Sequence, residues 1–146
     1  MLSNAYVDGN YVVAVINENN NRDSANGRWG SITLYGKDAN SNTYVDQMAI
    51  YQPSPYITFT DTPGWGYNEY GLGASKFIGV ESEMPYTYQV GDPDNAFSVV
   101  DVGPGGLRAY PLQSNSGSTA PHYLSVLVSN GFNDASITLS QSGYTS

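Results

Sequence analysis

Residues 122–143 read HYLSVLVSNGFNDASITLSQSG and hold two short runs in which apolar and polar side chains alternate. The first run spans Tyr123 to Val128 and the second spans Ser136 to Ser140. Alternation with a period of two predicts strands that bury one face. Asn130-Gly131 lies between the runs, and we expect positive φ at Gly131 because Gly tolerates that region without strain. The stretch therefore predicts a β-hairpin.

The rest of the chain continues this pattern. Short apolar or alternating runs occupy residues 11–16, 31–35, 47–51, 56–60, 76–80, 86–90, 97–102 and 107–112. Gly, Pro, Asn and Ser separate them, and Asn26-Gly27 is a second candidate for positive φ. No window carries a 3.6-residue apolar period, so we expect no long helix. Pro111 favours an edge or a bend for the run at 107–112. Together these signals predict an all-β sandwich or barrel.

An internal repeat links the two ends of the chain. Residues 31–36 and 48–54 form a strand–loop–strand unit that matches residues 124–131 and 136–143. In both copies the second strand is followed by a Gln, Gln52 or Gln141. We interpret residues 55–146 as a complete sandwich and residues 1–54 as a half-repeat, completed by packing on the rest of the chain or on another subunit.

The repeat resembles the BACON domain, an immunoglobulin-like sandwich of gut bacteria and of the crAss-like phages that infect them. The closest match is the final strand, Ile137 to Gly143, with its Gln-Ser-Gly ending; Asn19, Arg22, Arg28 and residues 32–34 match the middle of the pattern, and Gln52 its end. The resemblance implies an antiparallel, immunoglobulin-like β-sandwich and directs attention to a phage virion.

Composition restricts the chemistry. The 146 residues hold 13 acidic and 5 basic side chains, a net charge of -8. This balance disfavours nucleic acid, since Lys and Arg must neutralise phosphates. With no Cys and one His, thiol chemistry, His triads and multi-His metal sites are excluded within one chain. We expect no enzyme, no cofactor and no metal. The longest apolar run, 11–16, is too short to span a bilayer, and the first ten residues do not have the pattern of a signal peptide.

The acidic residues permit alternatives that we rank below a plain turn. Glu81, Glu83, Asp92 and Asp94 supply hard oxygen ligands for calcium or a carboxylate pair for a glycosidase. Asp92-Pro93-Asp94-Asn95 is also a good turn, and we favour that interpretation. His122 we expect to be a surface or capping residue.

Aromatic residues are the candidates for binding a partner. Trp65, Tyr67 and Tyr70 lie in a Gly-rich loop, where flat rings can stack on a sugar or on a protein. The opposing interpretation is a loop that folds its aromatic rings over one end of the sandwich. Tyr11 begins an apolar strand whose open edge would invite pairing with another chain.

The function that we predict is structural. We expect an auxiliary (decoration) protein of a phage capsid, present in many copies in the virion and bound to capsid or other virion subunits. The alternative is a carbohydrate- or mucin-binding module of an extracellular bacterial surface protein, with Trp65, Tyr67 and Tyr70 as its stacking platform. We expect neither nucleic acid nor a membrane as a partner.

Overall fold

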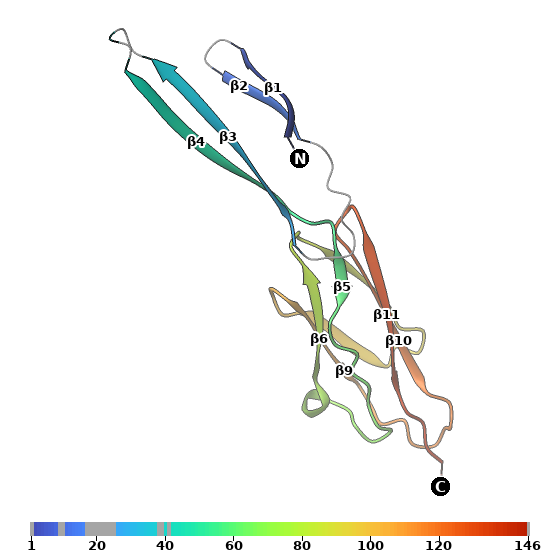
Figure 1. Ribbon diagram of the computed structural model, residues 1–146. Helices are drawn as coiled ribbons and strands as arrows, with labels where there is room; N and C mark the ends of the chain where they lie inside the picture. Colours follow the sequence, from blue (N-terminus) through green and yellow to red (C-terminus); the bar gives the residue numbers. More distant parts are fainter. Residues whose placement is uncertain (1, 9–10, 17–25, 38–39, 41, 146) are drawn as a thin grey trace.

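The computed structural model describes residues 2–8, 11–16, 26–37, 40 and 42–145, with the backbone alone for 2–8, 11–16, Lys37 and Tyr44 (Figure 1). Its strands are β1 (Leu2–Asp8), β2 (Tyr11–Ile16), β3 (Arg28–Lys37), β4 (Thr43–Gln52), β5 (Ile57–Phe59), β6 (Lys76–Ser82), β7 (Thr87–Gly91), β8 (Phe97–Asp101), β9 (Gly106–Pro111), β10 (His122–Ser129) and β11 (Asp134–Gln141). One turn of 3-10 helix, η1, spans Leu72–Ala74. No described helix is long and apolar enough to cross a membrane.

Strands β5 to β11 form two antiparallel sheets. One sheet has the order β5-β6-β9-β8 and the other β11-β10-β7. In chain order these are the strands A-B-E-D and G-F-C of an immunoglobulin constant-type sandwich. The prediction of an immunoglobulin-like antiparallel sandwich is therefore confirmed by the strand order itself.

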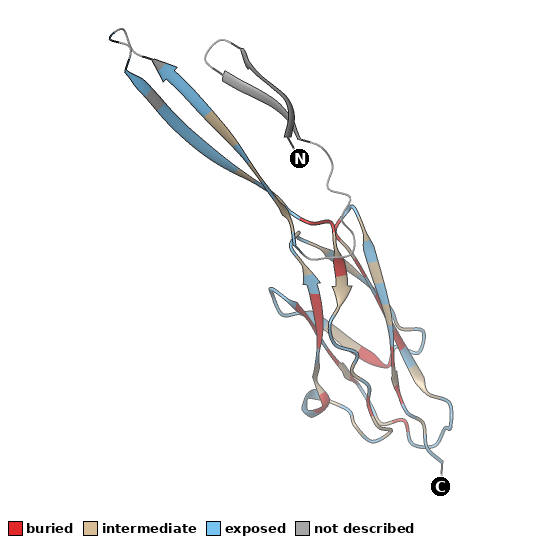
Figure 2. Cartoon of the chain, in the orientation of Figure 1, coloured by how far each residue is buried: buried red, intermediate tan, exposed pale blue. Residues whose placement is uncertain are grey.

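The core lies between these two sheets. Strand β10 shows why: Leu124, Val126 and Val128 are buried, while Ser125 and Leu127 between them are exposed. The same alternation places Ile78, Leu107 and Leu139 inside. Figure 2 shows the buried residues gathered in this body.

Strands β3 and β4 form a separate two-stranded sheet that we call the arm (residues 28–52). All ten residues of β3 pair with β4, from Arg28 opposite Gln52 to Lys37 opposite Thr43. Figures 1 and 2 show the arm projecting from the sandwich and largely exposed. Strands β1 and β2 form another antiparallel pair. The division into a half-repeat and a sandwich at residue 54 stays a prediction.

Three local expectations need correction. Strand β9 is not an edge strand: it lies between β6 and β8, and Pro111 is tolerated because it is the last residue of the strand. Strand β1 was not predicted at all. Gly131 has the expected φ of 86°, but φ of Gly27 is not positive. At Gly27 a Cβ would instead collide with the carbonyl oxygen of Gln52.

Candidate functional site

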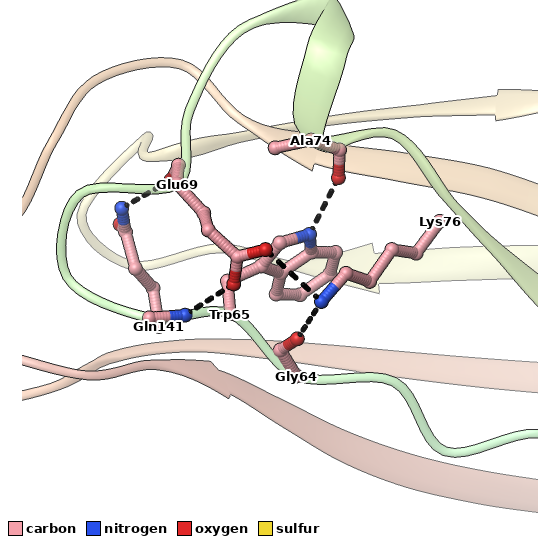
Figure 3. A network of polar contacts seen from close by, with 7 residues as sticks. Gly64, Trp65, Glu69, Ala74, Lys76 and Gln141 are labelled. Carbon is pink, nitrogen blue, oxygen red and sulfur yellow. Dashed lines mark hydrogen bonds and ion pairs between the residues drawn. The ribbon is translucent and has the colours of Figure 1, made fainter.

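Trp65 lies in the core and not on an exposed platform. Its side chain is 4% exposed and its ring packs against Phe97, with ring centroids 5.4 Å apart. The indole Nε1 donates a hydrogen bond to the Ala74 carbonyl at 2.7 Å (Figure 3). The Trp65 backbone pairs in parallel with Gln141 of β11. The predicted stacking role of Trp65 is therefore wrong in this fold, because no face of its ring is free for a ligand.

The other two aromatic residues of this loop lie nearer the surface. Tyr70 is 55% exposed. The Tyr67 ring stacks on Tyr144, with centroids 4.6 Å apart and an angle of 23° between the planes. Tyr70 and Tyr144 thus remain as exposed aromatic surface, whereas Tyr67 is half-buried. Tyr11, the fourth predicted residue, begins β2, and its side chain is outside the part that the structure describes.

Gln141 joins this loop to the sandwich. Its side chain is fully buried, and its Nε2 donates hydrogen bonds of 2.9 Å to the carbonyl oxygens of Glu69 and Gln113. Its Oε1 lies 3.3 Å from Nδ1 of His122, the residue opposite it on β10. In the sequence Gln141 stood out only as part of a pattern; in the structure it supplies hydrogen bonds to two partly buried carbonyls of neighbouring loops.

Glu69 and Lys76 close the same loop from outside. The Glu69 carboxylate accepts a 2.5 Å hydrogen bond from the Gly66 backbone N–H, which lowers the pKa of this carboxyl. Lys76 lies 3.4 Å from Glu69 and donates to the Gly64 carbonyl oxygen, as Figure 3 shows. The Gly-rich loop that was predicted to be a binding platform is thus fixed in place by the hydrogen bonds and the ion pair of Glu69 and Lys76.

Glu83, considered above as a calcium ligand or a hydrolase acid, connects the arm to the sandwich. One carboxylate oxygen accepts a hydrogen bond of 3.0 Å from Gly27 N–H. The other accepts from Tyr51 Oη at 2.5 Å and from Ser54 N–H at 3.0 Å. The Tyr51 hydrogen bond is the main reason why the pKa of Glu83 is lowered and that of Tyr51 raised. We call Glu83 and these three donors the clamp.

Residues 54 and 55, which lead from the arm into β5, are anchored to the sandwich. Ser54 is fully buried, and its hydroxyl accepts a hydrogen bond from Tyr56 N–H. The Pro55 carbonyl accepts one from Asn130 Nδ2 at 2.9 Å, in the turn between β10 and β11. The base of the arm is therefore held from two loops of the sandwich.

Asp92, another of the acidic candidates, acts within a turn, whereas Glu81 lies exposed on β6. The Asp92 carboxylate accepts hydrogen bonds from the N–H groups of Ala96 and Phe97, each 3.0 Å long. This turn places Asn95 at a φ of 49°. Among the described residues no three His, Cys, Asp or Glu side chains are arranged to hold a metal ion.

The arm carries the most conspicuous apolar surface of the described chain. Its exposed large apolar side chains belong to both faces: Trp29, Leu34, Tyr35, Val45, Met48 and Tyr51. Residues opposite each other share a face, so Tyr35 and Val45 lie on one face, whereas Ile32 and Met48 lie on the other. Trp29 and Tyr51 contact each other, with ring centroids 4.8 Å apart. None of these side chains was predicted to bind a partner, although the runs at 31–35 and 47–51 were predicted to be strands.

Comparison with known proteins adds little to this description. No protein-family model matches the chain, and no curated protein matches it. Among solved structures, a chimeric titin Z1Z2 functionalized with an exogenous KLER peptide from decorin is similar over 62% of this chain and 95% of its own, with 10% sequence identity and a TM-score of 0.43.

Proposed function

We propose that this chain is a non-enzymatic structural protein that acts by binding other protein subunits, as an auxiliary (decoration) protein of a phage capsid. The observation that carries the proposal is the arm, where large apolar side chains are exposed on both faces of a two-stranded sheet. Exposed apolar side chains of this size, gathered on one element, are typical of a protein interface and favour association of a protein that is free in solution.

The use of the polar residues supports a structural role over an enzymatic one. The carboxylates of Glu69, Glu83 and Asp92 each accept backbone N–H groups of their own chain. The His122 ring lies beside a buried Gln. A catalytic carboxylate must instead be free to reach a substrate. The hydrogen bonds of these side chains therefore support a structural role and not a catalytic one.

The BACON-like pattern of residues 137–143 and 19–34 supports the assignment to a phage virion. The net charge of -8 fits a protein that binds other proteins and not the packaged nucleic acid. We place the chain in the virion, in many copies, after assembly in the host cytoplasm.

Quantitative mass spectrometry of virions from the phage that encodes the chain tests this proposal. We expect peptides of the chain in amounts comparable to those of the major capsid protein. Recombinant chain with Trp29→Ser and Tyr35→Ser should bind capsids that lack it more weakly than the wild type. The proposal is contradicted if the chain is missing from purified virions, or if it proves to be part of a bacterial surface protein.

The carbohydrate-binding module is the second candidate, and the exposed rings of Tyr70 and Tyr144 favour it. It no longer includes Trp65, which is buried. A glycan array with the wild type and with a Tyr70→Ala, Tyr144→Ala double variant separates the candidates. Binding that the double variant loses favours the module, and an array without signal favours the virion.

A further inference from the structure

The four N-terminal strands match the last four strands of the sandwich in order and pairing. Strands β1 and β2 form an antiparallel pair, as β8 and β9 do, and β3 and β4 form one, as β10 and β11 do. The segment between β2 and β3 is residues 17–27, and that between β9 and β10 is residues 112–121. These connections are nearly equal in length. The N-terminal strands therefore correspond to D, E, F and G of an immunoglobulin-like unit.

The strand register supports this correspondence residue by residue. The first residue of β3 lies opposite the last residue of β4, Arg28 with Gln52, just as His122 lies opposite Gln141. Arg28 Nη2 donates to Gln52 Oε1 at 2.6 Å, and the His122 ring lies against Gln141 Oε1 in the same way.

Four residues further in, each position of the arm is more exposed than its equivalent in the sandwich. Ile32 and Met48 of the arm hold the places of Val126 and Ile137 in the sandwich. Val126 is fully buried, whereas its counterpart Ile32 is half-buried. Ile137 packs against the core, whereas its counterpart Met48 is 55% exposed. The face that forms the core in the sandwich is thus open in the arm.

The strands that would cover this face have no counterpart in residues 1–54. In the sandwich, β9 pairs with β6 and β10 pairs with β7, both antiparallel. Among the described residues, β2 and β3 each have one strand neighbour. Two strand edges and one apolar face are therefore open together, and two-stranded sheets of this kind are marginal in water.

We propose that a second copy of the chain completes this half-unit. A two-fold axis perpendicular to the sheets places β2 antiparallel to β2 of the partner, where β6 lies beside β9 in the sandwich. The same rotation places β3 antiparallel to β3 of the partner, where β7 lies beside β10. The product is an eight-stranded sandwich with one sheet ordered β1-β2-β2-β1 and the other β4-β3-β3-β4. A closed two-fold arrangement of this kind uses the same surface from both chains.

The charge of the arm does not oppose pairing with a second copy of this same chain. The strands of the arm contain Arg28, Lys37 and Asp46 as their only charged residues, although the whole chain has a net charge of -8. Two arms can thus approach without the repulsion that the acidic sandwiches would produce. The dimer rests on strand order and does not depend on the proposed capsid role. A chain that dimerises but is missing from virions would uphold the dimer and overturn only that role.

Light scattering after gel filtration tests the dimer on the full chain. We expect twice the 15.7 kDa mass of one chain for the wild type and the mass of one chain for Met48→Glu. The matched control is Val45→Glu, because Val45 is 58% exposed on the same strand but on the opposite face, and it should remain a dimer. Near-ultraviolet circular dichroism of the buried Trp65 reports whether each sandwich stays folded.

Single cysteines test the pairing of β3 directly, since the chain contains none. Ser31→Cys and Thr33→Cys lie on the face opposite the core face, and we expect at least one of them to form a disulfide between copies under mild oxidation. Ser125→Cys, on β10 between two strand neighbours, should not. A monomeric wild type, a dimeric Met48→Glu variant, or a dimer without any crosslink through β3 overturns the proposal.

Discussion

At the scale of single residues, Trp65 shows how a binding candidate becomes a core residue. Trp65→Ala removes the contact with Phe97 and the hydrogen bond to Ala74. We expect a loss of about 3–5 kcal/mol in the free energy of unfolding, as for other buried aromatic truncations. Tyr70→Ala, in the same loop but exposed, should change it by less than about 0.5 kcal/mol. Urea denaturation measures both; similar small effects for the two variants would contradict the buried position of Trp65.

Gln141 is the second residue whose change should be costly. Gln141→Leu keeps the volume but leaves the carbonyls of Glu69 and Gln113 without this donor. We expect the free energy of unfolding to fall by about 1–3 kcal/mol, because two partly buried carbonyls would lose their hydrogen-bond donor. Gln89→Leu, at an exposed position of β7, is the control and should be nearly neutral. Equal denaturation midpoints for the two variants would refute this role.

Glu83 gives the attachment of the arm a pH dependence. Its pKa is lowered, chiefly by the hydrogen bond from Tyr51, so its contribution is present above the ordinary value of 4.5 and is lost as the pH falls below that value. We expect the amide resonances of Gly27 and Ser54 to shift in NMR spectra over this acidic range. Glu83→Gln should abolish the shift.

Tyr51→Phe offers a complementary change at the clamp, since it removes the hydroxyl and nothing else. It should raise the pKa of Glu83 towards its ordinary value. Glu81→Gln, two residues before Glu83 and on β6, should leave the titration of the clamp as it is in the wild type. A titration of Gly27 and Ser54 that persists in Glu83→Gln would show that another group causes it.

At the scale of elements, the turn between β10 and β11 depends on backbone conformation. Gly131 has a φ of 86°, and Asn130 Oδ1 accepts hydrogen bonds from Phe132 and Asn133 N–H. Gly131→Val should lower the free energy of unfolding by about 1–2 kcal/mol, because a β-branched residue is strained at positive φ. Gly73→Val is a matched control: a Cβ meets open space at both positions, but φ of Gly73 is not positive. An unchanged melting temperature for Gly131→Val would reject the strain.

At the scale of the whole molecule, the arm and the sandwich differ in how they are stabilised. The sandwich has a closed core between two sheets, whereas the arm has two strands and is joined at its base through the clamp and Ser54. Deleting residues 1–52 should therefore leave a folded, soluble sandwich that no longer assembles. Thermal unfolding and light scattering of the truncated chain test this. If residues 53–146 are unfolded on their own, the chain is one domain and the repeat argument fails.

The class of fold and the positions of ten strands, including β10 and β11, could be predicted from the amino-acid sequence, because alternation of apolar and polar side chains is a local signal. The sequence also contains the match between Gln52 and Gln141. It did not reveal β1, whose residues Leu2–Asp8 lack a clear alternation. Nor did it place β9 in the middle of its sheet, since the order of strands depends on contacts between distant residues.

The roles of the polar and aromatic candidates became clear from the three-dimensional contacts. An aromatic residue in a Gly-rich loop looks the same in a sequence whether it faces solvent or the core, and Trp65 turned inward because Phe97 and Ala74 lie there. A carboxylate such as Glu83 likewise takes its role from donors that are far away in the chain, Gly27 and Tyr51. Such roles arise from long-range geometry, which the side-chain pattern along a single strand does not contain.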